Sequence, residues 1–290
     1  MKNNYLKKGA GSLLASAFLL SACGGNAQKK QENETQPAPV TAAASGVQTL
    51  QAGNVTITWI QDNAEDKLMP RSLFSDAPDS IINQLSLQAG IPSSVSTFVI
   101  KTDSLRILFD TGLGAPDSRL AEGLKSIGMT PNDIDCLYLT HLHGDHIGGM
   151  LKGDSIVFPN AEVYVSKTEY DAWMNMPGQQ KTQAMRTMEK YKNHLHLFEF
   201  GDTLPGNVIA IDATGHTPGH TAFQVGKVLV AGDLMHGAAL QKPHPEYCAN
   251  YDMDKKKAAE TRVRILNYVQ ENKLVMAGMH LPAPAFLQPE

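Results

Sequence analysis

Three histidines and an aspartate lie within six residues of one another, in the order His141, His143, Asp145 and His146. Imidazole and carboxylate side chains together suit Zn²⁺ and related cations, whereas Ca²⁺ and Mg²⁺ prefer oxygen ligands. A lone histidine is usually a hydrogen-bonded structural residue. This cluster instead indicates a site for two divalent metal ions, because the apolar run 134–139 before it predicts a buried strand that ends at the site.

Two metal ions need more ligands than this cluster supplies, and three later segments carry suitable side chains. They are the turn 213–220 with His216 and His220, the strand 228–233 ending in Asp233, and the strand 275–280 ending in His280. Each of these candidates lies at or beyond the end of an apolar run, where loops gather and sites are built. The sequence therefore predicts one site assembled from distant segments.

The sequences THLHGDH at 140–146 and GHTPGH at 215–220, together with Gly232-Asp233 and the late His280, resemble the metallo-β-lactamase-fold hydrolases. The resemblance covers about residues 47–290. It implies an α/β fold, the four-layer αββα sandwich of that family. The irregular alternation of predicted strands and helices independently favours two sheets with outer helices.

The resemblance also implies a ligand set for two divalent ions, with Zn²⁺ expected. The ligands are His141, His143 and His220 for a first ion, Asp145, His146 and His280 for a second, and Asp233 between them. His216 is then expected to support the site without binding metal. Asp110 is a candidate acceptor for the second N–H of a metal-bound imidazole, with a turn or helix-capping role as the alternative.

Asp233 stands where true β-lactamases usually have Cys or Ser, and the segments 232–236 and 278–284 resemble methyl parathion hydrolases and N-acyl-homoserine lactonases. This branch implies a hydrolase in which a hydroxide shared by two metal ions attacks a small lactone, ester or phosphotriester. Asp145 is a candidate to orient that hydroxide. His236 is a candidate proton donor to the leaving group, with a packing role as the alternative.

Two other functions fit the same motifs. A thioesterase like glyoxalase II shares the GHTPGH and Gly232-Asp233 segments, and a non-catalytic zinc-binding lipoprotein needs only the ligands. The substrate is expected to be a small molecule rather than nucleic acid. The formal charge of −4 becomes −7 if residues 1–22 are removed, because they contain three lysines and no acids. An acidic chain without a basic run is unsuited to nucleic acid.

The N-terminal residues predict export and anchoring. Residues 1–22 combine lysines with a short apolar run and resemble a lipoprotein signal peptide, so Cys23 is the expected lipidation site. Residues 23–46 are polar and predict a flexible tether, which leaves 47–290 as the hydrolase domain. The expected location is the bacterial cell envelope, lipid-anchored to a membrane and facing the periplasm or the exterior. The alternative is an ordinary signal peptide.

Hydrophobic patterns predict the elements that position the site. The predicted strands are 54–60, 95–101, 105–109, 134–139, 162–165, 208–212, 228–232 and 274–278, and the predicted helices are 117–127, 167–175, 179–192 and 255–271. Tyr170, Trp173, Met174 and Met176 are expected to pack in the core, with a pocket wall as the alternative. Related hydrolases continue into closing strands, so with only 281–290 after His280 a sheet edge is expected to be missing.

Overall fold

The structure is a computed structural model that describes residues 46–102, 104–179 and 181–289. The predicted signal peptide, the predicted lipidation site Cys23 and all of the predicted tether except residue 46 lie outside these residues. Among the helices of the described ranges, none is long and apolar enough to cross a membrane.

The larger sheet has seven strands in the order β1-β2-β5-β6-β7-β10-β11. They are β1 (Val47–Ala52), β2 (Val55–Gln61), β5 (Ser96–Lys101), β6 (Arg106–Phe109), β7 (Cys136–Tyr138), β10 (Glu162–Ser166) and β11 (Leu195–Phe198). The four strands from β6 to β11 are parallel. Their carboxyl ends therefore meet at one edge of the sheet, and the loops that follow them lie together there.

The second sheet has six strands in the order β12-β13-β14-β15-β16-β17. They are β12 (Thr203–Leu204), β13 (Val208–Asp212), β14 (Thr221–Val225), β15 (Val228–Val230), β16 (Val275–Ala277) and β17 (Phe286–Leu287). Neighbouring strands are antiparallel except β15 and β16, which are parallel. The segments after β15 and β16, which carry Asp233 and His280, therefore leave the sheet side by side.

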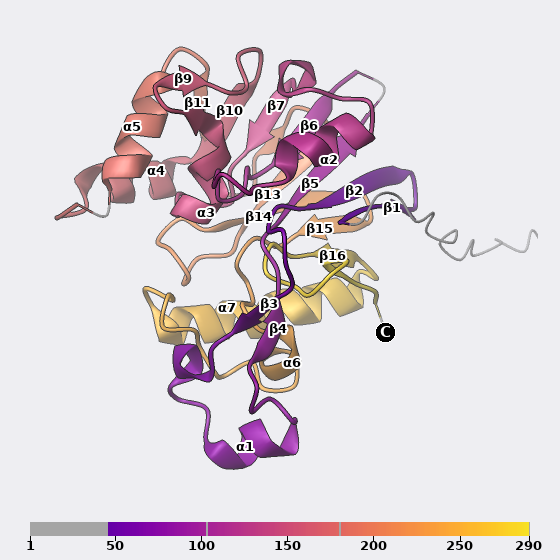
Figure 1. Cartoon of the computed structure of the whole chain (residues 1–290), viewed down its shortest axis with the longest axis vertical. Coiled ribbons are helices and arrows are strands. Elements are labelled where there is room, and N and C mark those ends of the chain that lie inside the picture. Colours follow the sequence, from indigo (N-terminus) through magenta and orange to yellow (C-terminus); the bar gives the residue numbers. More distant parts are fainter. Residues whose placement is uncertain (1–45, 103, 180, 290) are drawn as a thin grey trace, which may run out of the picture. The chain divides into compact units, whose positions relative to one another are not determined.

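The alternation of side chains along the strands builds two cores. Ile107 and Phe109 of β6 face the second sheet, whereas Leu108 between them faces outward. The outward face is covered by α2 (Leu120–Ser126), α4 (Lys167–Asn175) and α5 (Thr182–Lys190), and the second sheet is covered by α7 (Lys255–Glu271). The predicted four-layer α/β sandwich is thus confirmed (Figure 1).

A smaller group of elements packs around its own apolar cluster. It consists of β3 (Lys67–Met69), β4 (Ile91–Ser93), the 3-10 helix η1 (Arg71–Phe74), α1 (Asp79–Gln84) and α6 (Ala238–Gln241). In the view of Figure 1, β3 and β4 cross α7, and α6 and α1 lie below them. The sequence pattern predicted no element here, because these pieces are short and their apolar residues follow no sustained period.

The predicted strands and helices all form, with ends shifted by a few residues. The remaining short elements are η2 (Pro131–Asp133), α3 (Gly144–Ile147), η3 (Gly148–Met150), β8 (Leu151–Lys152) and β9 (Ser155–Ile156). Residues after His280 add a two-residue strand to the edge of the second sheet. These residues turn back, and β17 pairs with β16 through Met276 opposite Leu287.

Candidate metal centre

The predicted ligands converge at the carboxyl ends of strands from both sheets. The loop after β7 carries His141 and His143 and leads into α3, which carries Asp145 and His146. Since β7 belongs to the larger sheet and Asp233 follows a strand of the second, the cluster lies where the two sheets meet.

Asp233 occupies the middle of the cluster. Its Oδ1 lies 3.1 Å from His146 Nε2. Its Oδ2 lies 3.1 Å from His280 Nε2, 3.3 Å from His216 Nε2 and 3.7 Å from His141 Nε2. One carboxylate therefore contacts these four imidazoles, one through Oδ1 and three through Oδ2, so it could serve as a ligand shared by two ions.

The potential ligand atoms form four overlapping groups, each with its atoms within 4.8 Å of one another. Two of these groups together contain most of the predicted ligands, and the other two both include His236. Of the two with most of the predicted ligands, the first contains His141, His143, His216 and Asp233, and the second contains Asp145, His146 and His280. In the first group, His143 Nδ1 lies 2.9 Å from both His141 Nε2 and His216 Nε2. In the second, Asp145 Oδ2 lies 3.3 Å from His280 Nε2.

These positions fit divalent metal ions. A tetrahedral ion with bonds of about 2.1 Å holds its ligand atoms roughly 3.4 Å apart, close to the separations found here. His146 Nε2 and Asp233 Oδ1 are buried yet make no hydrogen bond within the described residues. Buried polar atoms normally have partners, so these two atoms mark a place where a ligand is expected.

The two histidines of the GHTPGH turn have different neighbours in this structure. His220, expected as a ligand, has Nδ1 2.9 Å from Ala213 O, while its Nε2 accepts a hydrogen bond of 3.0 Å from the backbone N–H of Asp233. Both ring nitrogens are therefore occupied. His216, expected to support the site without binding metal, instead presents Nε2 to Asp233 and His143. The geometry thus favours His216 over His220 as a ligand.

The ring nitrogens that face away from the cluster have fixed partners. His146 Nδ1 lies 2.7 Å from Asp110 Oδ2, as the sequence predicted for this aspartate. Thr140 donates to the same carboxylate and contacts His141 Nδ1 at 3.0 Å. His280 Nδ1 donates to Ser94 O at 2.8 Å. Such partners fix the tautomer and orientation of a metal-binding imidazole.

His216 is oriented by Asp252, which the sequence analysis missed. His216 Nδ1 lies 2.9 Å from Asp252 Oδ1, and the other oxygen of Asp252 lies 3.3 Å from a guanidinium nitrogen of Arg262. Both side chains of this ion pair are buried. Arg262 also donates to the carbonyl oxygen of Leu234 at 2.8 Å. Neither residue has a local motif, and Arg262 stands among the exposed basic residues of α7.

His236 lies inside the cluster rather than at its mouth. Its Nε2 is 3.1 Å from Asp233 Oδ2, and its ring stacks against His280 with centroids 5.0 Å apart. The side chain is buried. The contact with Asp233 shows that this histidine helps to hold the central carboxylate.

The charges of the cluster depend on one another. Burial opposes the protonated form of His216 and His280, but the neighbouring aspartates outweigh it and raise the pKa of each to about 9. Burial and the neighbouring His216 lower the pKa of His143 to about 3. Burial opposes the carboxylate form of Asp233, yet the surrounding imidazoles hold its pKa well below the usual range. The centre is a desolvated network of opposite charges.

Two hollows open onto the centre. One of about 490 Å³ is lined by the cluster and by Lys67, Leu113 and Tyr251. The other, of about 480 Å³, shares His143, Gln183 and Tyr251 with the first and adds Trp173 and Met253. Leu113, Tyr251 and Met253 are 43%, 55% and 45% exposed. The approach to the centre therefore combines large apolar side chains with one lysine.

The apolar stripe predicted in α4 packs as expected. Tyr170, Trp173, Met174 and Met176 all join the core cluster beneath the outer helices. Trp173 fits both the core-packing and the pocket-wall interpretation, because its ring also lies edge-on to His143 with centroids 5.4 Å apart.

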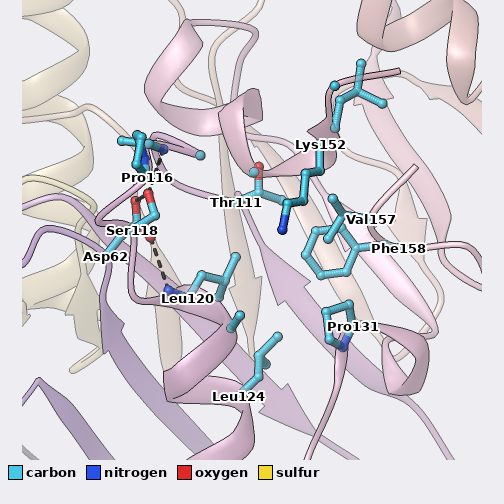
Figure 2. Close-up of a pocket in the computed structure, with 16 residues that line it drawn as sticks. Asp62, Thr111, Pro116, Ser118, Leu120, Leu124, Pro131, Lys152, Val157 and Phe158 are labelled. Carbon is cyan, nitrogen blue, oxygen red and sulfur yellow. Dashed lines mark hydrogen bonds between the residues drawn. The ribbon is translucent and has the colours of Figure 1, made fainter. Parts of the chain in front are cut away.

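A third hollow, of about 590 Å³, lies beside the loop after β6 and does not include the cluster (Figure 2). Buried Asp62 stands at its edge and accepts hydrogen bonds from Leu113 N, Ser118 Oγ and Leu120 N. Thr111, on its wall, donates from both its amide and its hydroxyl to His146 O. The walls of this hollow thus help to fix the loop behind the centre.

Residues 90–278 match the family described as the metallo-beta-lactamase superfamily. This chain belongs to that superfamily. The predicted family and fold are thereby confirmed.

Solved structures resemble it over most of the chain. The hydrolase AbOPH of the beta lactamase superfamily is 30% identical, with a TM-score of 0.74 over 86% of this chain and 94% of its own. AidC, a dizinc quorum-quenching lactonase solved with a product, is 24% identical, with a TM-score of 0.77 over 84% of this chain and 93% of its own. The likeness to AidC, at 24% identity, shows that the two proteins share a fold.

Curated relatives match over shorter stretches. The lactamase-like protein aptB of Emericella nidulans is 28% identical over 198 residues, which are 63% of this chain and 55% of that protein. An N-acyl homoserine lactonase of Bacillus thuringiensis is 29% identical over 125 residues, 41% of this chain and 46% of the lactonase. The chain thus spans about half the length of these two relatives.

Proposed function

We propose that the protein is a binuclear metal-dependent hydrolase of small lactones, esters or phosphotriesters that carry an apolar group. The observation that carries this proposal is the position of Asp233, whose carboxylate contacts buried imidazoles of both groups, His216 of the first and His146 and His280 of the second. A carboxylate shared in this way favours a two-metal site over a single structural ion.

The residues present fit two divalent ions, and their nitrogen and oxygen atoms fit Zn²⁺. His141, His143 and His216 would hold the first ion, Asp145, His146 and His280 the second, and Asp233 both. When bound, such a pair of ions lowers the pKa of a shared water and polarises a carbonyl or phosphoryl oxygen. No serine or cysteine nucleophile is then required.

The side chains of the centre have separate tasks in this proposal. Asp145 is 27% exposed and lines the cavity, so it can orient the attacking water and accept its proton. His236 points Nε2 at Asp233. That contact supports a role in holding the carboxylate rather than the proton donation to the leaving group that the sequence predicted.

The cavity supports a substrate with an apolar chain or ring. Leu113, Tyr251 and Met253 expose apolar surface around the opening, and ligand pockets are mostly lined by such side chains with a few polar groups. An extended apolar rim is not needed by a protein that only stores zinc. The relative named as a lactonase also supports a lactone substrate.

A thioester is the second candidate substrate. Atrochrysone carboxyl ACP thioesterase of Passalora fulva is 34% identical over 131 residues, which are 44% of this chain and 32% of that enzyme. The same attack on a polarised carbonyl would cleave a thioester.

We further propose that the protein is a lipoprotein of the bacterial cell envelope, anchored through Cys23. The lysines and the apolar run before Cys23 support this proposal. It is independent of the hydrolytic function.

The substrate class is tested by measuring hydrolysis by the purified full-length protein. The panel contains a homoserine lactone, an aryl ester, methyl parathion, a cephalosporin and an acyl thioester. We expect one of the first three classes to be clearly preferred, with the preference increasing with the length of the apolar group. Preference for the thioester would favour the second candidate, and no turnover on any class would contradict the proposed substrates.

A further inference from the structure

Glu169 is a buried carboxylate in the first turn of α4 that belongs to neither ligand group. Four donors surround it. Oε1 accepts hydrogen bonds from Leu142 N at 3.0 Å and from Trp173 Nε1 at 2.6 Å. Oε2 accepts from Thr217 Oγ1 at 2.7 Å and from Gly219 N at 2.8 Å. Its two oxygens are therefore fully used by donors from three different segments.

Two of these segments carry the histidines of the first group. Leu142 lies between His141 and His143 in the loop after β7, and Thr217 directly follows His216 in the turn before β14. Glu169 thus ties together one loop from each sheet. Without this carboxylate, several buried backbone and side-chain donors would lose their acceptor.

The packing around Glu169 adds to this connection. A side chain at Gly219 would lie 2.1 Å from the backbone nitrogen of Glu169, so only glycine lets the turn approach α4 this closely. Trp173, which donates to Glu169, lies edge-on to the ring of His143. One carboxylate therefore contacts neighbours of all three histidines of the first group.

We propose that Glu169 is a positioning residue that sets His141, His143 and His216 for the first metal ion. This inference rests on the ligand assignment of the proposed function. The second group is held by other contacts, because His146 is fixed by Asp110 and His280 by Ser94. Loss of Glu169 should therefore weaken one metal position and spare the other.

The chemistry of the four partners requires a carboxylate at this position. A glutamine has the same shape, but its amide nitrogen would face either Leu142 N and Trp173 Nε1 or Thr217 Oγ1 and Gly219 N. In either orientation the NH₂ group of the glutamine would face a backbone N–H, which is itself a donor and cannot accept a hydrogen bond. Glu169→Gln therefore tests the acceptor role with little change in volume.

The experiment is a metal titration of the full-length protein and its variants. Each protein is stripped of metal and titrated with Co²⁺, whose absorption reports the ligand geometry, and Zn²⁺ affinities are measured against a competing chelator. The matched control is Glu162→Gln, which alters a half-exposed carboxylate at the start of the neighbouring strand β10 that contacts His194 and His196.

We expect Glu169→Gln to weaken the binding of the first ion by about 10–100-fold, which is the usual effect of losing a group that orients metal ligands. The second site of Glu169→Gln should keep the wild-type affinity, and so should both sites of Glu162→Gln. Thr217→Val and Trp173→Phe remove one donor each while leaving the carboxylate, so they should give smaller losses at the first position and test the inference if Glu169→Gln does not fold.

Unchanged affinity at both positions in all three variants would overturn the role of Glu169 while leaving the two-metal function intact. Equal weakening of both positions would also overturn it, since it would indicate general loss of structure. If the unsubstituted protein binds fewer than two ions, the proposed function itself fails and this inference fails with it.

Discussion

At the scale of single residues, Asp233 is the side chain that joins the two halves of the centre. We predict that Asp233→Ala removes one metal equivalent per chain and nearly all hydrolysis, because each ion loses a ligand and the surrounding imidazoles lose their shared anion. Metal content by mass spectrometry and turnover would be measured together. Full activity with two bound ions would contradict the bridging role.

His216 and His220 offer a direct test of the ligand assignment. His216→Ala should reduce the affinity of the first ion by at least about 10-fold, since it removes a nitrogen that faces the central carboxylate. His220→Ala should reduce it less, because the ring nitrogens of His220 contact the backbone of Ala213 and Asp233. A Zn²⁺ titration of both variants decides between them, and the opposite order would restore the ligand set implied by the family resemblance.

Residue types and motif order were enough to predict Asp145, His146, Asp233 and His280 as parts of one cluster. The choice between His216 and His220 was not predictable from spacing. In this structure His216 Nε2 faces Asp233, whereas His220 Nε2 accepts from the backbone of Asp233, and such a difference depends on the fold of the turn. Glu169 and Asp252 were missed because each is an isolated acid far along the chain from the histidines that it supports.

At the scale of elements, α7 reaches the centre through the buried ion pair of Arg262 and Asp252. Removing one partner of a buried pair leaves a desolvated charge, so we predict that Arg262→Ala lowers the free energy of unfolding by about 3–5 kcal/mol. Urea denaturation would measure the change. Arg264→Ala is the control, because this exposed neighbour bonds only the carbonyl oxygen of Asp212 within the described contacts, and it should change stability by under about 1 kcal/mol.

Equal stability of the two arginine variants would show that the buried pair does not hold α7 against the second sheet.

How well a strand could be predicted from the sequence depended on its burial and its length. The apolar runs of β2 and β5 were predicted from the sequence pattern, because each strand is buried along most of its length. The two-residue strand β17 was not, since no pattern of so short a segment distinguishes a strand from a turn.

At the scale of the whole molecule, the proposed lipid anchor should determine where the protein is located without affecting its catalysis. We predict that Cys23→Ser moves the protein from the membrane fraction to the soluble fraction of the producing cells without changing its hydrolytic rate, because Cys23 precedes the catalytic domain. Fractionation followed by an activity assay would measure both. Unchanged membrane partitioning of the variant would contradict the lipid anchor.

The central claim for the whole molecule is that it holds two divalent ions and needs both for hydrolysis. The most direct measurement is the metal content of the purified full-length protein, followed by chelation and stepwise return of Zn²⁺ with the rate recorded at each step. We predict two ions per chain, loss of activity on chelation, and full recovery only as the second equivalent binds. One ion per chain, or full activity after chelation, would contradict the account.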